Sequence, residues 1–449
     1  MRALPPVDAS VVETLRTRFH RGVFWSVAAA VASSGFNFVL NIIIARLLGR
    51  QGYGQFGMVQ STIATVAGIA QLAMGYTATK FVAEFRSSNP ARTGRVIGLC
   101  SVVSLLTGSV AAAALYVSAP WLAASLLKAP GLSGALQLAS VMVLFTVLTG
   151  YQMGALAGLE SYRSMAVLAL GSGAANLVAA AIGTKVWGLD GSIAGVGAGS
   201  AVQWAMFRWM LAADCRRKGI VVTRRELRSE RSVLLSFALP AALAGLSSMP
   251  ALWFANAFLV RQASGFSQMA LYTAAFSLRS FVFFLPSLLN RVSMSLLNNQ
   301  KGLGNWEGYV RVFRINVVST TASVVMGAVV VAVIGVRILN IFGRDFRVGF
   351  PVLLVLLLAA VVEALTGSLY QIVQAESRMW ASMFVIALPR DLLIVFLSYI
   401  LSPKLGALGL ATAYTIGWTV AGVATGLLVI RIGTRPVWPE VVAGAPQSR

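Results

Sequence analysis

The sequence predicts an all-α polytopic membrane protein of about twelve transmembrane helices, arranged in two six-helix halves. Three observations lead to this fold class. The 449 residues are 57% hydrophobic and only 11% charged, with a mean hydropathy of +0.79, whereas soluble domains are about 25% charged. Apolar runs long enough to cross a bilayer recur along the chain, and the second half repeats features of the first. A chain this apolar requires lipid as the solvent for most of its surface.

Apolar runs of roughly 18 to 25 residues can cross the ~30 Å hydrocarbon core as helices. Connections between the runs are short, except around 213–232 and 293–313. The predicted spans are 22–45, 55–79, 95–118, 135–157, 164–186, 190–212, 233–259, 268–292, 314–336, 350–374, 381–401 and 406–430.

The basic residues predict the orientation of these spans. With the N-terminus inside, 25 of the 36 Lys and Arg residues face the cytoplasm, nine face outside and two fall within spans. The positive-inside rule therefore places both termini in the cytoplasm. The segment Arg216–Arg231 contributes most, and its interpretation is an orientation signal at anionic headgroups rather than a nucleic-acid site.

An internal repeat divides the chain into halves. Asn41 and Arg46 recur as Asn256 and Arg261 at an offset of 215, and Lys128 and Glu160 recur as Arg344 and Glu376 at 216. We also match Gly191 with Gly406. Because six spans separate the copies, the halves share one orientation, and a transport site is expected at their seam. The predicted organisation is a cytoplasmic segment 1–21, a bundle 22–212, a basic linker 213–232, a second bundle 233–430 and a cytoplasmic tail 431–449.

Four motifs, in order along the chain, resemble the Wzx-type oligosaccharide flippases of the multidrug/oligosaccharidyl-lipid/polysaccharide exporter superfamily. They are NFVLNIIIARLLGRQGYGQFGMVQS (37–61), GYTATKFVAE (75–84), GLESYR (158–163) and IFGRDF (341–346). The resemblance implies two pseudo-symmetric six-helix bundles that form a V around a central cavity. It also implies a flippase that moves polyprenyl-diphosphate-linked oligosaccharide across the bacterial cytoplasmic membrane by alternating access, for surface polysaccharide synthesis. Implied partners are this substrate, membrane lipids and a polysaccharide polymerase or chain-length regulator.

Two other functions stay open. An ion-coupled exporter of small amphiphiles, as in the drug-antiporter branch, usually has an acidic residue in its first helix, where this chain has Asn37 and Asn41. A membrane enzyme of polysaccharide assembly needs acids or bases on a sizeable outer loop, and the outer connections here carry few acids. With one His, two Cys and no GxxxxGK[ST] motif, no cofactor or metal site is predicted.

Ionisable residues within spans are the candidate site. Arg279, Glu363, Arg390 and Asp391 all lie in the second half, and each costs ~2.5–3.5 kcal/mol to insert unless it faces a cavity or a partner. Arg279 and Arg390 would hold the substrate diphosphate, because guanidinium stays charged and binds phosphate bidentately. The alternative is that they neutralise Glu363 and Asp391, which could otherwise couple transport to an ion. Adjacent helical residues point about 100° apart, so Arg390 and Asp391 are expected to seek partners on other helices.

Further candidates surround this site. Asn41 and Gln60 could hydrogen-bond the sugar, and Gln60 aligns with Arg279 if Tyr53 is matched with Tyr272. Arg46 and Arg261 occupy equivalent outer helix ends, either as snorkelling anchors or as a ring of positive charge at the exit. Pro250, Pro286 and Pro389 lie inside predicted spans of the second half, whereas the predicted spans of the first half lack interior prolines. The second half is therefore expected to bend more during transport.

Overall fold

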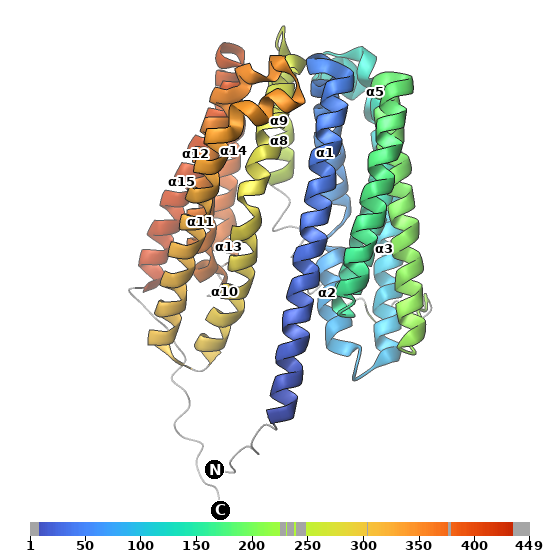
Figure 1. Cartoon of the computed structure of the whole chain (residues 1–449), viewed down its shortest axis with the longest axis vertical. Helices are drawn as coiled ribbons and strands as arrows, with labels where there is room; N and C mark the ends of the chain where they lie inside the picture. Colours follow the sequence, from blue (N-terminus) through green and yellow to red (C-terminus); the bar gives the residue numbers. More distant parts are fainter. Residues whose placement is uncertain are drawn as a thin grey trace, which may run out of the picture. The chain divides into compact units, whose positions relative to one another are not determined.

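The computed structural model describes residues 9–224, 230, 238, 248–302, 304–375 and 379–433, and within these ranges it is helical with no β-strand. The chain divides into two compact units, Met1–Met249 and Pro250–Arg449. The long helices of each unit run roughly parallel to one another (Figure 1). The predicted linker 213–232 lies partly, and the predicted tail 431–449 mostly, outside the described residues, so these domain boundaries stay predictions.

The part of the first unit that the structure describes contains five α-helices before α8 (Ser248–Val260). Figure 1 shows α1 beside α5 within it. Their bounds are α1 Ala9–Ala70, α2 Met74–Phe85, α3 Pro90–Trp121, α4 Ser133–Gly158 and α5 Tyr162–Arg217, with a π-helical stretch Leu122–Leu126 and a 3-10 turn Pro130–Leu132 after α3. Side chains of α2, α3, α4 and α5 form its core, including Met74, Cys100, Leu156 and Phe207.

The second unit contains the remaining helices. The bounds are α8 Ser248–Val260, α9 Gly265–Val282, α10 Phe284–Gly302, α11 Trp306–Phe342, α12 Phe350–Ala375, α13 Met379–Ala381, α14 Leu388–Leu405 and α15 Ala407–Gly433. A 3-10 turn Arg344–Gly349 precedes α12, and a π-helical stretch Ser382–Ala387 precedes α14. The first residues of α8 belong to the first unit by the division at Met249.

Eight helices in the described part are long and apolar enough to cross a membrane. Nine of the twelve predicted spans fall on these eight, because α5 carries two spans joined at Trp187 and Gly188. The predicted second span, 55–79, begins on α1 after its kink at Gly49 but is divided, because α1 ends at Ala70 and α2 begins at Met74. The predicted eighth span is divided into α9 and α10, which meet at Phe283. The predicted seventh span, 233–259, is described only at 238 and in α8.

Some predicted spans end before the helix on which they lie, because the helix continues beyond the apolar run. The predicted third span ends at 118, whereas α3 continues through Pro120 to Trp121. The first half therefore does contain a proline inside a helix, although none lies inside its predicted spans. Pro120 lies near the end of α3, beyond the apolar run from which the span was predicted.

The structure extends the internal repeat and corrects one match. Asn89 and Asn305, 216 residues apart, cap α3 and α11 by accepting backbone N–H bonds from Arg92 and Gly308, each 2.9 Å long. Gly406 has φ 56° and ψ −133°, and its counterpart is Gly188 with φ 59° and ψ −131°. The predicted match with Gly191 was thus displaced by three residues. Glycine is favoured at both turns because a side chain is strained at this φ.

Glycines also set close helix approaches in the first unit. A Cβ on Gly195 would lie 2.4 Å from the carbonyl oxygen of Ala179, and one on Gly191 would lie 1.9 Å from that of Gly183. These contacts join the two parts of α5 on either side of its kink. Such small residues let membrane helices approach closely.

Candidate functional site

Three side chains from three helices meet inside the second unit. Arg279 on α9 is 5% exposed, and its Nη2 pairs with Oε2 of Glu363 on α12. The same Nη2 donates to the Tyr414 hydroxyl on α15 at 3.0 Å, and that hydroxyl donates to Glu363 Oε2 at 2.8 Å. We call these residues the arginine triad. The pairing that the sequence left open as a structural alternative is therefore present.

Aromatic rings surround the guanidinium of the arginine triad. Its Cζ lies 4.8 Å from the ring centroid of Phe276, 4.6 Å from that of Phe283 and 5.1 Å from that of Tyr414. Such cation–π contacts stabilise a desolvated cation. Arg279 also lies in the last turn of α9, where the helix dipole favours positive charge.

The hydrogen-bonding capacity of Arg279 is only partly used. Its Nε is buried, and no residue in the described ranges accepts a hydrogen bond from it. A guanidinium carries five N–H donors in a fixed fork. The Glu363 side chain is 21% exposed against 6% for Arg279, so the carboxylate is the more accessible partner of the pair.

The second predicted charge pair is formed within one helix. Arg390 Nε donates to Asp391 Oδ1 at 2.8 Å, and Arg390 Nη2 lies 2.7 Å from the same oxygen. Arg390 and Asp391 thus pair with each other, which the expectation of partners on other helices did not include. A long arginine side chain can fold back across the 100° between adjacent helical positions. The guanidinium Cζ also lies 4.4 Å from the Trp418 ring centroid on α15.

The predicted polar residues of the first unit have separate surroundings. Asn41 donates to Asn37 Oδ1 at 2.6 Å and accepts from the Tyr53 hydroxyl at 2.9 Å, which ties the two parts of α1 together across Gly49. Gln60 is half-buried, and the structure records no hydrogen bond to its side chain from the residues it describes. The match of Gln60 with Arg279 stays a prediction.

The predicted exit arginines are both exposed. Arg46 lies on α1 three residues before the Gly49 kink, and Arg261 directly follows α8. Exposure suits snorkelling and an exit ring equally well, so the choice between them stays open.

Sequence reasoning missed Tyr414 and Trp418. Both lie in the apolar helix α15, where a tyrosine or a tryptophan is expected to be an ordinary core residue. The available signal was the hydroxyl of Tyr414, because a buried tyrosine in an apolar span needs a hydrogen-bond partner.

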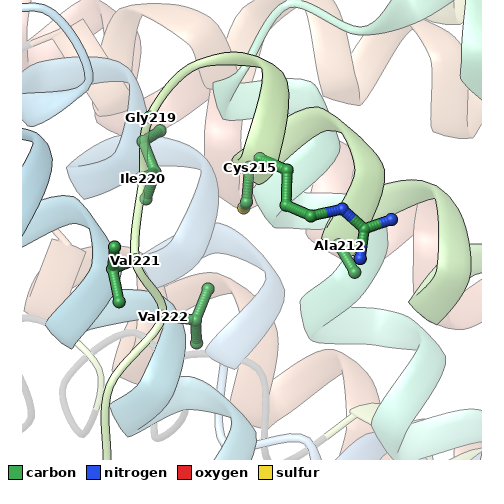
Figure 2. A pocket seen from close by; sticks show the side chains of 7 residues that line it. Ala212, Cys215, Gly219, Ile220, Val221 and Val222 are labelled. Carbon is green, nitrogen blue, oxygen red and sulfur yellow. The ribbon is translucent and has the colours of Figure 1, made fainter.

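A pocket of about 440 Å³ lies where α5 ends and the chain turns into an extended segment. Figure 2 shows Cys215 and Ala212 on the helix and Ile220, Val221 and Val222 on that segment. The carbonyl oxygens of Val221 and Thr223 rest against α3, at 2.0 Å and 1.9 Å from where a Cβ would stand on Gly94 and Gly98.

Charged contacts reinforce this docking. Glu230, 2% exposed, accepts from Arg92 Nε at 3.2 Å and from Arg95 Nε at 3.3 Å. The described part of the predicted orientation signal is therefore anchored on α3. Residues 225–229 and 231 of that signal lie outside the described ranges.

A neighbouring cluster lies at the ends of α4 and α5. Lys218 donates to the carbonyl oxygen of Leu159, and Arg86 donates to that of Gly158 at 2.9 Å and pairs with Glu160. Burial lowers the pKa of Lys218 below its ordinary value of 10.5, and Asp214 opposes that shift. Both cations cap the last carbonyls of α4. Within the described ranges, no group of three or more His, Cys, Asp or Glu residues is placed to hold a metal ion.

The helices and the buried charges define a multi-pass membrane protein with the fold of known transporters. An inward-facing multidrug resistance MATE family transporter of the MOP superfamily matches with a TM-score of 0.77 at 16% identity, over 91% of this chain and 98% of that chain. The lipid II flippase MurJ in an inward closed conformation matches with a TM-score of 0.71 at 13% identity, over 91% of this chain and 87% of that chain.

The chain belongs to the polysaccharide biosynthesis protein family, whose model matches residues 19–330. The EPS I polysaccharide export inner membrane protein EpsE of Ralstonia solanacearum is 26% identical over 287 residues, which are 62% of this chain. The match likewise spans 62% of the length of that relative.

Proposed function

We propose that this protein is a flippase that carries polyprenyl-diphosphate-linked oligosaccharide across the cytoplasmic membrane by alternating access. Family membership supports a role in polysaccharide biosynthesis, and one relative is named a polysaccharide export inner membrane protein. A neighbour in fold is named a lipid II flippase, so this architecture is compatible with moving a lipid-linked saccharide. These relatives favour transport over catalysis, and we assign no catalytic residue.

The observation that carries the proposal is the buried, partly uncommitted guanidinium of Arg279. A lipid diphosphate brings its negative charge out of water during translocation, and that charge must be stabilised at low dielectric. Arg279 supplies a permanent cation with N–H donors that no described residue uses. Bidentate hydrogen bonds from arginine suit phosphate oxygens.

In this proposal Glu363 is the resident counter-ion of the empty carrier. Its pairing with Arg279 avoids an isolated buried cation when no substrate is bound. An incoming diphosphate would take over the guanidinium, and Glu363 would keep the hydrogen bond from Tyr414. Glu363 could then accept a proton or a cation, which would link transport to an ion gradient.

The other candidates complete the proposal. Arg390 would act as a second cation with Asp391 as its counter-ion, and Asn41 and Gln60 would contact the sugar. Arg46 and Arg261 would attract the diphosphate at the exit. Both termini would be cytoplasmic, and a polymerase or a chain-length regulator would receive the product.

The test is the sidedness of lipid-linked oligosaccharide in inverted and right-side-out membrane vesicles. Arg279→Gln is compared with Arg279→Lys, which keeps the charge but loses the fork, and with Arg337→Gln, which alters an exposed arginine of α11. We expect the glycolipid to remain on the cytoplasmic face without the protein and with Arg279→Gln at normal abundance. Arg279→Lys should transport partially and Arg337→Gln normally.

Unchanged sidedness in every case, including loss of the protein, would overturn the proposal. Export of soluble amphiphiles would then be measured, because the fold is shared with a multidrug transporter. Transport that needs the protein but not Arg279 would retain the flippase and remove the proposed cationic site.

A further inference from the structure

A network of neutral side chains lies between α10, α11 and α12 in the second unit. Asn316 on α11, 2% exposed, accepts at Oδ1 from Ser293 at 2.6 Å and from Thr320 at 3.2 Å. Its Nδ2 donates to Asn290 Oδ1 at 3.1 Å and to Gln371 Oε1 at 3.2 Å. Both sides of the Asn316 amide are therefore occupied.

The network fixes the orientation of the Asn290 side chain on α10. Gln371 Nε2 donates to Asn290 Oδ1 at 2.8 Å and to the Asn290 backbone oxygen at 3.1 Å. The Asn290 oxygen thus receives two N–H donors, one from Asn316 and one from Gln371. The oxygen and the nitrogen of a carboxamide diverge from one carbon atom. Because the Asn290 oxygen is directed at these two donors, its NH₂ group points out of the network.

That NH₂ group donates to none of the residues that the structure describes. Asn290 is half-buried, and none of the described residues accepts a hydrogen bond from its Nδ2, which also is not among the fully buried polar atoms. Two N–H donors facing hydrocarbon would cost several kcal/mol. The group therefore faces water or a polar ligand.

The first unit shows that the fold does not need these amides. At the repeat offset of 216, the positions of Asn290, Asn316 and Gln371 are taken by Met74, Cys100 and Ala155. All three are buried in the core of that unit, at 1%, 0% and 0% exposure. A purely structural requirement would be met by apolar packing, as it is there.

We propose that Asn290 binds an uncharged oxygen of the saccharide, such as a hydroxyl or an amide carbonyl, and that Gln371 and Asn316 are positioning residues. This inference rests on the proposed flippase function and adds a sugar-recognising group to it. A neutral N–H donor suits a neutral acceptor, whereas the anionic diphosphate is the ligand of Arg279.

The arginine triad and the amide network share one helix, α12, but lie at different positions along it. Glu363 and Gln371 are eight residues apart on α12, which is about 12 Å at 1.5 Å per residue. The charged and the neutral contacts therefore fall at different levels of that helix. A substrate with a diphosphate at one end and sugars beyond it matches this separation of chemistry.

The experiment uses full-length protein reconstituted in vesicles and two probes, polyprenyl diphosphate without sugar and polyprenyl diphosphate bearing one N-acetylhexosamine. The measured quantity is the ratio of their translocation rates. Asn290→Leu removes the donor, and Asn290→Gln retains an amide. Gln371→Leu frees the orientation of Asn290. Thr273→Val is the matched control, because the Thr273 hydroxyl donates within α9 to the Met269 carbonyl oxygen at 2.8 Å and is not part of the network.

We expect Asn290→Leu to reduce the preference for the sugar-bearing probe about 10-fold, since one hydrogen bond is worth roughly a factor of ten. Asn290→Gln should restore part of it, Gln371→Leu should lower it and Thr273→Val should leave it unchanged. An unchanged preference in Asn290→Leu that folds normally by its thermal transition would overturn the inference while leaving the flippase intact. Wild-type protein that moves neither probe would overturn the proposed function and this inference together.

Discussion

Breaking the ion pair of the arginine triad should destabilise the protein more than removing both of its charges. Removing one partner of a buried pair costs about 3–5 kcal/mol, because the remaining charge is left uncompensated. Glu363→Gln leaves a cation that is 5% exposed, although the glutamine can still accept from Arg279 and Tyr414. We therefore expect a loss of about 3 kcal/mol, at the lower end of that range.

The opposite variant should cost less. Arg279→Gln leaves a carboxylate whose side chain is 21% exposed and which still accepts from Tyr414 at 2.8 Å. It can also neutralise itself by protonation. We expect a loss of about 2 kcal/mol from this variant and about 1 kcal/mol or less from the double variant, because replacing both charges avoids an isolated ion.

The assay is denaturant unfolding of the four proteins in mixed micelles. The coupling energy between the two positions follows from the double-mutant cycle and should be about 4 kcal/mol or more. Additive effects, with a coupling below about 0.5 kcal/mol, would refute the reasoning that Glu363 neutralises Arg279. A double variant less stable than both single variants would refute it as well.

The remaining predictions concern the first unit and the repeated helix caps. Because burial lowers the folded-state pKa of Lys218, the unfolded chain binds more protons than the folded chain between that lowered pKa and 10.5. The free energy of unfolding should therefore rise with pH in this window. The rise should be smaller in Lys218→Met, and equal pH profiles of the two proteins would count against this role of Lys218. Gly94→Ala places a Cβ 2.0 Å from the Val221 oxygen and should speed tryptic cleavage in 216–231. Gly426→Ala, whose Cβ would have nothing within 4 Å, should leave cleavage unchanged. Equal digestion rates in the two variants would contradict the docking of this segment on α3. Asn89→Ala and Asn305→Ala should each cost about 1 kcal/mol by thermal unfolding in detergent, and a loss in only one would show that the two caps are not equivalent.

The sequence was informative wherever a property depends on local composition. Long apolar runs specify membrane helices because the backbone must satisfy its hydrogen bonds internally in lipid, and nine predicted spans lie on the eight long apolar helices. It was less reliable at helix ends and breaks. The division at Phe283 is marked only by Pro286 in the first turn of α10, which removes one helical hydrogen bond without fixing where the helix ends. The extension of α3 to Trp121 lies past the apolar segment.

The repeat illustrates the same limit on a finer scale. An offset near 216 could be read from scattered residues, and the caps at Asn89 and Asn305 follow it. The counterpart of Gly406 could not be chosen from the letters, because several glycines lie near Gly188. Only the backbone angles distinguished the glycine that forms the turn from those that pack against a neighbouring helix.

By itself, the sequence determined that the chain is a multi-pass helical membrane protein with ionisable residues inside its second half. The insertion cost of a charge makes such residues visible without coordinates. Only the tertiary structure decided their partners: Arg279 pairs across helices with Glu363 and Tyr414, whereas Arg390 pairs with its own neighbour. The same holds for the orientation of Asn290, which depends on donors from two other helices. The physical reason is that the desolvation cost of a charge depends on the residue type, whereas the contacts that relieve this cost depend on which helices pack together.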